Sequence, residues 1–377
     1  MAKNEQKTRR SPWRGIAAAA IVLLILAIAG IGGASFFREM RRMQPPESSV
    51  LTETTTTTTE TTTTTSRYPQ AATRTTETVT LSGESLIRAR NAVLIEKTAS
   101  GSRMIAERDC DTAVYPASLT KIMTLITFLE GYDRQKLDDV AEMRPEILEF
   151  AHANAASCAG FFAGELCTVR DLLYGLMLPS GADAALMLAR LKSGSEAGFV
   201  AQMNALAAEM GLTQTHFVNC TGLHDEAHRS SVHDIARMLS YALDDPVSTE
   251  ILSAAEHRTA STAQHASGIR LVSTVFSRMR NDLLTEHGCQ IQVRGGKTGY
   301  TDEAGQCLAT FADLPDGRRF LCVVAGCPPK APMDAVFDTL TLFQLAEQPL
   351  SAIARIEPPA ETTAAEADTT TVSARIE

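Results

Sequence analysis

The order of apolar and polar positions predicts strands at both ends of a helical centre. Residues 91–97 and 103–107 lie on either side of Ala99-Ser100-Gly101-Ser102, which is typical of a β-hairpin. Residues 318–326 predict an apolar strand, with 307–312 as its hairpin partner. Apolar residues at helical spacing predict helices over residues 117–130, 169–177, 182–191, 196–210, 232–241 and 333–348. This order indicates an α+β fold, in which helices cover an antiparallel sheet.

The first 37 residues predict a cytoplasmic tip followed by a membrane segment. The run 15–37 is apolar and free of charge, and it is long enough to span a bilayer at 1.5 Å per residue. The basic residues in front of it predict a cytoplasmic N-terminus and an extracytoplasmic remainder. We favour a retained single-pass anchor, because the run is long and three arginines follow it. A cleaved signal peptide is the alternative, since small residues near Ala29 and Ala34 have cleavage-site spacing.

One folded domain is expected between two polar segments. Residues 52–66 are almost entirely Thr and cannot bury a core, so 38–80 is predicted to be a disordered linker. The stretch 349–377 has a similar character and is predicted to be a disordered tail. The catalytic domain is therefore expected at 81–348. The net charge of −9 indicates no basic surface that would attract nucleic acid, so we expect no nucleic-acid partner.

Eight cysteines in an exported domain are compatible with disulfide bonds. Cys158 and Cys167 bracket a short glycine-containing segment, and they are the pair that we expect to be bonded. Cys322 and Cys327 lie at the end of an apolar run and are expected to be buried thiols. No Cys or His spacing resembles a metal site, so no metal is expected.

A serine and a lysine one helical turn apart are the first candidate catalytic residues. Ser118 opens the predicted helix after Pro116, where free backbone N–H groups and the helix dipole favour negative charge. Lys121 is three residues further on, within reach of the Ser118 hydroxyl. A lysine whose pKa is lowered by burial can take the proton of a serine nucleophile. An amphipathic helix with a surface lysine is the alternative interpretation.

Two further motifs follow in an order that suits one active site. Ser180 lies where the helical pattern breaks after Pro179, and there a side chain can project into a cleft or cap a helix. Residues 295–299 are typical of an edge strand whose glycines allow a substrate to approach closely. On that strand Lys297 would attract a carboxylate and Thr298 would donate a hydrogen bond. Together the three motifs predict a serine acyl-transfer enzyme.

The sequence resembles the serine-type D-alanyl-D-alanine carboxypeptidases, which are low-molecular-weight penicillin-binding proteins. The resemblance rests on residues 115–124, 168–181, 215–219 together with 222–224, and 296–299, and it covers most of residues 88–326. It implies the β-lactamase/transpeptidase-like fold, an antiparallel sheet with a mostly helical subdomain and the active site between them. It implies peptidoglycan stem peptides ending in D-Ala-D-Ala as substrates, β-lactam antibiotics as inhibitors, and no cofactor.

The same resemblance assigns roles to individual residues. Ser118 would be the acyl-enzyme nucleophile, Lys121 its base, and Ser180 the proton relay towards the leaving D-Ala. Backbone N–H groups of Ser118 and Tyr300 would form the oxyanion hole. Substrate binding would involve Lys297, Thr298, Gly299 and Tyr300.

One departure from the family pattern keeps alternatives open. The family has Asn two residues after the second serine, whereas this chain has Ala182. A lost hydrogen bond to a reacting group costs about 1.5–3 kcal/mol, so activity about ten- to a hundredfold lower is expected without compensation. A catalytically weakened wall-binding homologue is therefore one alternative. A serine β-lactamase is another, although Glu196, Glu209 and Glu226 lack the expected Glu-x-x-x-Asn arrangement.

Overall fold

The computed structural model describes residues 67–83, 86–99, 101–329, 331 and 333–357. The chain divides into Met1–Thr64, which lies outside the described residues, and Thr65–Glu377, which contains all of them. The predicted membrane segment 15–37, the linker up to residue 66 and the tail from residue 358 therefore lie outside the described residues. In the part of the chain that is described, no helix has the length and apolar character needed to cross a membrane.

The centre of the fold is a sheet of six strands among the described residues, in the order β1-β3-β2-β10-β9-β8. These strands are β1 (Val79–Thr80), β2 (Asn91–Thr98), β3 (Gly101–Arg108), β8 (Gln292–Thr301), β9 (Gly305–Asp313) and β10 (Arg319–Cys327). Only β1 and β3 pair in parallel within this sheet, and the other neighbours are antiparallel. In the middle of the sheet Val323 pairs with Val93 and with Ala309, and all three are fully buried. Around these pairs β2, β9 and β10 are apolar, because both faces of the sheet are covered there.

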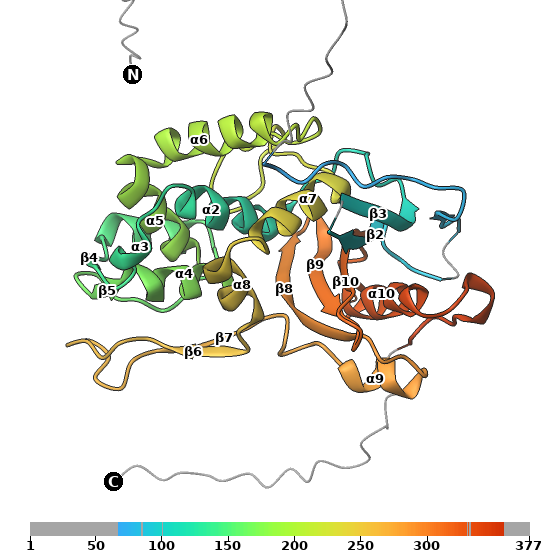
Figure 1. The fold of residues 1–377 in the computed structure, drawn as a ribbon. Helices are drawn as coiled ribbons and strands as arrows, with labels where there is room; N and C mark the ends of the chain where they lie inside the picture. Colours follow the sequence, from blue (N-terminus) through green and yellow to red (C-terminus); the bar gives the residue numbers. More distant parts are fainter. Residues whose placement is uncertain (1–66, 84–85, 100, 330, 332, 358–377) are drawn as a thin grey trace, which may run out of the picture. The chain divides into compact units, whose positions relative to one another are not determined.

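Helices cover both faces of this sheet, as Figure 1 shows. The helices of the described residues are η1 (Ala117–Leu119), α2 (Thr120–Leu129), η2 (Arg134–Lys136), α3 (Pro145–Ala153), α4 (Val169–Met177), α5 (Ala182–Ser193), α6 (Glu196–Glu209), α7 (Val232–Ala242), α8 (Pro246–Ser253), α9 (Asn281–Glu286), α10 (Asp334–Phe343), η3 (Gln344–Ala346) and η4 (Leu350–Ala352). Of these, α7 and α10 pack directly on the sheet, on opposite faces. Two short strand pairs lie beside the helical part. One pair is β4 (Val140–Glu142) with β5 (Leu166–Thr168), and the other is β6 (Glu256–Arg258) with β7 (Arg270–Val272).

The two faces of the sheet define two apolar cores. One core joins the sheet to the helical subdomain and includes Phe128 of α2 and Phe199 of α6, both fully buried. The other joins the opposite face to α9 and α10 and includes Leu340 and Phe343. The predicted α+β architecture, an antiparallel sheet with a mostly helical subdomain, is confirmed. The sheet and the helical subdomain together form the walls of the candidate site.

The structure differs from the sequence-based expectation at several boundaries. The helix expected over 117–130 is a 3-10 turn, η1, followed by α2 from Thr120, so Ser118 precedes the α-helix. Part of the segment expected to be a linker is folded: Tyr68 is buried and β1 pairs with β3. Part of the expected tail is folded as well, because Ile356 is fully buried and its N–H donates to Thr341.

The expected disulfide between Cys158 and Cys167 is wrong. All eight cysteines are free thiols, and Cys167 is buried in β5. The expectation of buried thiols at Cys322 and Cys327 is confirmed.

Candidate active site

The turn that carries Ser118 has a strained backbone. Ala117, directly before Ser118, has a φ of 47°, a left-handed conformation that is unfavourable for a residue with a side chain. The hydroxyl of Thr120 donates to the Ala117 carbonyl at 2.8 Å. Gly222 packs against that same carbonyl, and a Cβ at Gly222 would lie 2.0 Å from the carbonyl oxygen. The surrounding structure thus fixes the backbone on which Ser118 is presented.

A buried histidine completes this support. The Nε2 atom of His228 lies 2.8 Å from the hydroxyl of Thr120, and its Nδ1 accepts from the Val218 N–H at 3.1 Å. Nδ1 is therefore unprotonated, and Nε2–H donates to Thr120, which in turn donates to Ala117. Burial lowers the pKa of His228 to about 4, so the ring is neutral around pH 7. His228 was not predicted from the sequence as part of the site.

Lys121 lies in the first turn of α2 with its ammonium group directed at Ser118. The Nζ atom donates to Ser118 Oγ at 3.1 Å and to the Thr221 carbonyl at 2.6 Å. Only 2% of Lys121 is exposed, and burial lowers its pKa to about 8, while the nearby Cys220 and Asp183 act in the opposite direction. A substantial fraction of Lys121 is therefore neutral near physiological pH and able to accept the Ser118 proton.

The carbonyl that holds Lys121 belongs to a turn built around Asn219. The Asn219 Oδ1 accepts from Thr221 N–H at 3.1 Å, from the Thr221 hydroxyl at 3.0 Å and from Gly222 N–H at 2.7 Å. Its Nδ2 donates to the Leu223 carbonyl at 2.9 Å. One side chain thus orients both the Thr221 carbonyl and the glycine that packs on Ala117. The sequence match over 215–219 and 222–224 lies on both sides of Thr221, but it did not reveal the contact of the Thr221 carbonyl with Lys121.

The same turn is anchored to the helices behind it. Cys220 donates through its N–H to Glu196 at 3.1 Å and through its thiol at 3.3 Å. The hydroxyl of Thr124 donates to the Cys220 carbonyl at 2.7 Å. Glu196, one of the glutamates considered for a β-lactamase, is thus bound to the turn that holds Lys121.

The strand β8 forms the opposite wall and contains the Lys-Thr-Gly motif. Lys297 is fully buried, and its Nζ donates to the Thr298 carbonyl at 2.8 Å. Its pKa lies well below the ordinary value, chiefly because of burial and also because the cations of Lys121 and Arg278 are near. The Thr298 hydroxyl lies 2.7 Å from that of Thr274. A carboxylate bound beside Lys297 would place a negative charge next to these cations. Arg278 and Thr274 were not predicted from the sequence as part of the site.

The glycines of β8 permit close packing against the turn that holds the nucleophile. A Cβ at Gly299 would lie 3.2 Å from the Pro116 carbonyl and 3.3 Å from the Ala117 side chain. A Cβ at Gly295 would lie 2.0 Å from the Leu252 carbonyl on α8. The strand can therefore pass directly beside η1, and β8 stands at the end of the strand order, as expected of an edge. An extended peptide can pair with such an edge.

Ser180 lies in the break between α4 and α5, as the pattern around Pro179 predicted. Its φ of 67° is left-handed, and its side chain is largely buried. Two residues further on, Ala182 is 1% exposed, and its N–H donates to the Ser157 carbonyl at 2.7 Å. The fully buried carboxylate of Asp183 accepts from Ala159 N–H at 2.9 Å, and burial raises its pKa. The strained break is thus fixed by backbone contacts on both sides.

A cavity of about 320 Å³ lies where these elements meet. It is lined by Ser118, Lys121, Asn154, Ala155, Ala156, Ser157, Ala182, Thr221, Gly222, Leu223, Tyr300, Thr301 and Asp302. The structure therefore brings Ser118, Lys121 and Tyr300 to one cavity. Ser180 and Lys297 are buried and do not line it. Ala182 does line it, so the residue that departs from the family pattern faces the candidate site.

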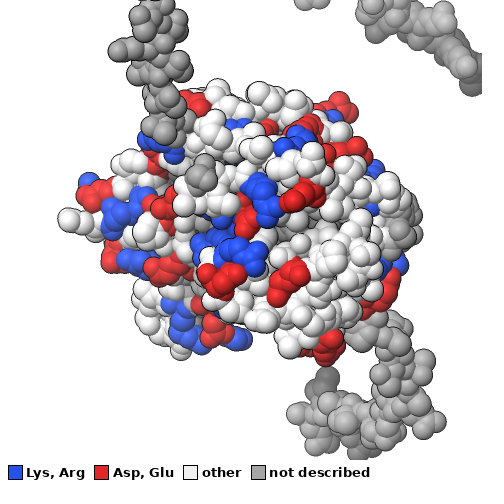
Figure 2. All heavy atoms as spheres, turned by 45° about the vertical axis from the view of Figure 1, so that its right-hand side comes forward, with Lys and Arg blue, Asp and Glu red and all other residues white. Residues whose placement is uncertain are grey.

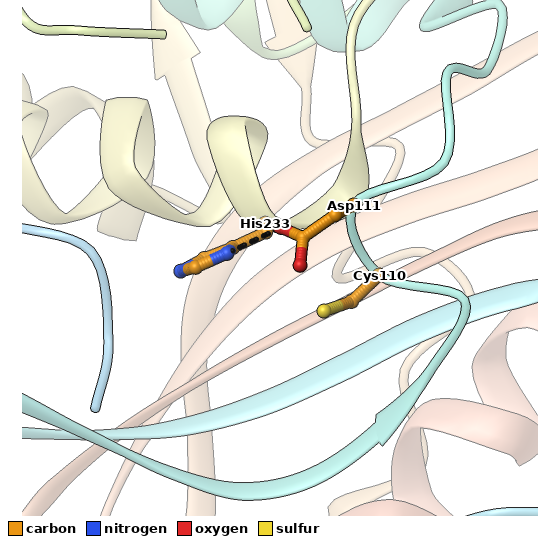
Figure 3. Close-up of side chains that lie close together, drawn as sticks. All are labelled: Cys110, Asp111 and His233. Carbon is orange, nitrogen blue, oxygen red and sulfur yellow. Dashed lines mark hydrogen bonds and ion pairs between the residues drawn. The ribbon is translucent and has the colours of Figure 1, made fainter. Parts of the chain in front are cut away.

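Cys110, Asp111 and His233 form a separate cluster of groups able to bind metals (Figure 3). His233 Nδ1 lies 2.8 Å from Asp111, and its Nε2 accepts from the Ala72 N–H at 3.1 Å. Arg74 donates to Cys110 at 3.0 Å and to Asp111 at 2.6 Å. Both nitrogens of His233 are already hydrogen-bonded, and the Arg74 guanidinium supplies positive charge to Cys110 and Asp111. The cluster therefore fits a structural role, holding residues 72–74 in place, better than it fits a metal site.

Basic and acidic side chains alternate over the face drawn in Figure 2. Ion pairs among the described residues include Arg74 with Asp111 and Arg319 with Asp313. Because the two signs are interspersed, charge on the drawn face is locally balanced.

Ser118 and Lys121 lie at one cavity, as expected of a serine acyl-transfer site, and the comparisons identify the family. Residues 75–328 match the peptidase S11 family, described as D-alanyl-D-alanine carboxypeptidase. The chain belongs to this family. It is 33% identical over 244 residues to D-alanyl-D-alanine carboxypeptidase DacF of Bacillus subtilis, covering 64% of this chain and 58% of that relative. It is 34% identical over 220 residues to a D-alanyl-D-alanine carboxypeptidase of Streptomyces strain K15, covering 57% of this chain and 73% of that relative.

Solved structures show the same fold. A mutant of the Streptomyces K15 DD-transpeptidase superposes with a TM-score of 0.60 at 25% identity, covering 69% of this chain and 98% of that one. The D-alanyl-D-alanine carboxypeptidase of Mycobacterium tuberculosis H37Rv superposes with a TM-score of 0.55 at 26% identity, covering 71% and 94%. The resemblance to the family and its fold, inferred from four short stretches, is confirmed.

Proposed function

We propose that this protein is a serine D-alanyl-D-alanine carboxypeptidase that removes the terminal D-Ala of peptidoglycan stem peptides and is acylated by β-lactams. The single observation that carries the proposal is the buried Lys121 amine, 3.1 Å from the Ser118 hydroxyl, with its pKa lowered to about 8. A lysine in this state can activate a serine at neutral pH. Membership in the peptidase S11 family supports the same reaction.

The chemistry begins with attack by Ser118. Its Oγ adds to the carbonyl carbon of the penultimate D-Ala while Lys121 takes the hydroxyl proton. The backbone N–H groups of Ser118 and Tyr300 stabilise the oxyanion. The C–N bond then breaks, and the proton passes through Ser180 to the amine of the departing D-Ala. Water finally hydrolyses the ester on Ser118 and restores the free hydroxyl.

Substrate binding is assigned to the edge strand. The terminal carboxylate is held by Lys297 and by the Thr298 hydroxyl, and the peptide backbone runs along Gly299 and Tyr300. A carboxylate beside Lys297 offsets the burial and the neighbouring cations that lower its pKa in the free site.

A catalytically weakened homologue is the second candidate, and one observation favours it. Ala182 lines the cavity and offers no amide to the substrate or to Lys121. Incubating the purified domain with diacetyl-L-Lys-D-Ala-D-Ala separates the two candidates. Release of D-Ala, followed by mass spectrometry, supports the carboxypeptidase. Acylation by penicillin without release of D-Ala supports the weakened homologue.

We propose further that the enzyme acts outside the cytoplasm, at the cell wall, and is held to the membrane by residues 15–37. The charge-free run and the basic residues before it support this proposal. Flotation of the full-length chain with membranes tests the attachment. Mass spectrometry of its N-terminus distinguishes a retained anchor from a cleaved signal peptide, since cleavage near Ala29 or Ala34 removes most of the run.

A further inference from the structure

The tetrapeptide Ala-Arg-Ile-Glu occurs twice in the sequence, at residues 354–357 and again at 374–377. The first copy follows η4 and belongs to the described residues, whereas the second copy lies outside them. The first copy therefore shows which contacts this tetrapeptide makes with the domain. The second copy carries the same four side chains and the same backbone groups.

The arginine of the first copy is bound to buried acidic groups on α10. Arg355 Nη1 donates to Asp338 Oδ1 at 2.6 Å, and Nη2 lies 3.6 Å from Asp334. The side chain of Asp338 is fully buried, and its other oxygen accepts from the N–H groups of Arg88 and Ala89. Loss of the guanidinium would leave this carboxylate buried without its paired cation, which strongly destabilises a protein.

The other three residues of the first copy are bound as well. Ile356 is fully buried, and its N–H donates to the Thr341 hydroxyl at 2.9 Å. The carbonyl of Ala354 accepts from Gln344 Nε2 at 2.8 Å. The carboxylate of Glu357 lies 2.9 Å from Nε of the arginine in the same copy. Among the described residues after η4, these hydrogen bonds and ion pairs begin and end with the repeated tetrapeptide.

The chain between the two copies is long enough for the second copy to reach the site of the first. Equivalent residues of the copies are 20 positions apart, and residues 358–373 are mainly small or polar. A flexible chain can return to its starting point, and the entropic cost of closing the loop grows slowly with its length. The first copy has the shorter tether and therefore occupies the site in the wild-type chain. The second copy competes at an effective concentration on the order of millimolar.

We infer that the surface of α10 around Asp338 is a binding site for Ala-Arg-Ile-Glu, and that residues 374–377 of the same chain occupy it when the first copy is displaced. Arg375 then pairs with Asp338, and Ile376 fills the buried position of Ile356. The second copy thus preserves the packing of α10 after loss of the first. This inference does not depend on the proposed carboxypeptidase function.

The test displaces the first copy and follows the second by proteolysis. Arg355→Gln, made in the full-length chain in a mild detergent, removes the buried ion pair and also the trypsin site of the first copy. The lost ion pair weakens the first copy by more than the longer tether disfavours the second. Bound Arg375 is shielded from trypsin, so mass spectrometry should show cleavage after Arg375 at least about fivefold slower than in wild type.

Two further variants make this result specific. Arg355→Gln combined with Ile376→Ser should restore the fast cleavage after Arg375, and it should unfold at lower urea than Arg355→Gln alone. Arg170→Gln is the matched control, because Arg170 pairs with the exposed Asp138 in the helical subdomain. It should leave cleavage after Arg375 at the wild-type rate.

Several outcomes would overturn the inference. One is equal cleavage after Arg375 in wild type and in Arg355→Gln, and another is slow cleavage that persists with Ile376→Ser. Unfolding of Arg355→Gln despite its intact second copy, seen by circular dichroism, would also overturn it, since the second copy would have failed to replace the first. Slow cleavage that light scattering shows only in dimers would assign the bound copy to a neighbouring molecule and contradict binding within one chain.

Discussion

The ammonium group of Lys121 lies 3.1 Å from the hydroxyl of Ser118 and 2.6 Å from the Thr221 carbonyl, which is 100 residues away in the sequence. The first contact joins the candidate nucleophile to its base. The second fixes the lysine, since Asn219 orients the Thr221 carbonyl through hydrogen bonds to the neighbouring backbone. The chemistry therefore depends on a turn far from the Ser-x-x-Lys motif.

Activity should rise with pH through the titration of Lys121. Below its pKa the lysine is protonated and cannot accept the Ser118 proton, and above it the lysine is neutral. Since burial lowers this pKa to about 8, kcat/KM for the diacetyl peptide should increase with a midpoint near pH 8. Lys121→Arg should abolish turnover, whereas exchange of the exposed Lys136 for Arg should leave the profile unchanged. A flat profile between pH 6.5 and 9.5 would contradict Lys121 as the base.

Stability at acid pH should depend on His228. Burial lowers its folded pKa to about 4 from 6.5, so between these values the unfolded chain binds a proton that the folded protein does not. Stability from this group is complete above about pH 6.5 and is lost as pH falls towards 4. The loss between pH 7 and 4.5 should be about 2 kcal/mol.

Urea unfolding at the two pH values measures this loss. His228→Gln should be less stable at pH 7, because it disturbs the contact with Thr120, but its stability should change less between the two values. The exposed His216 is the matched control, and His216→Gln should show the full wild-type loss. An identical pH dependence in wild type and His228→Gln would refute the assignment.

Sequence patterns predicted the helices and strands better than they predicted the tertiary contacts between them. The spacing of Ser118 and Lys121 indicated their proximity because residues three apart share a helical face. Nothing local indicated the left-handed backbone of Ala117, which is stabilised by Gly222 and Thr120 through tertiary packing. Composition also misplaced the boundaries: residues 67–80 are polar, yet they fold because the domain supplies partners such as His233 for the Ala72 N–H.

Lys297→Met should impair peptides with a free terminal carboxylate far more than the same peptides as C-terminal amides. Methionine keeps the bulk of this fully buried side chain but removes its charge. A lost charge-assisted hydrogen bond is worth about 1.5–3 kcal/mol. The ratio of kcat/KM for free acid to amide should therefore fall about ten- to a hundredfold. Equal losses on both peptides would mean that Lys297 serves only to support β8.

Ala182→Asn should raise the rate of acylation. Ala182 lines the cavity, so an amide there can bond the substrate backbone and Lys121. We expect about a tenfold increase in penicillin acylation, from one recovered hydrogen bond of about 1.5 kcal/mol. Rapid-quench measurement of the acyl-enzyme for both forms checks this. A tenfold decrease would show that the loop at Ser157, bonded to the Ala182 N–H, already fills the space of the missing amide.

The most direct test of the account is the site of acylation by penicillin. Intact-mass analysis of the domain after incubation should show the addition of one penicillin molecule, and peptide mapping should place it on Ser118. Ser118→Ala should show no adduct. Exchange of Ser157, an exposed serine that lines the same cavity, for Ala should leave the adduct in place. An adduct on another residue, or none in the wild-type domain, would contradict Ser118 as the nucleophile.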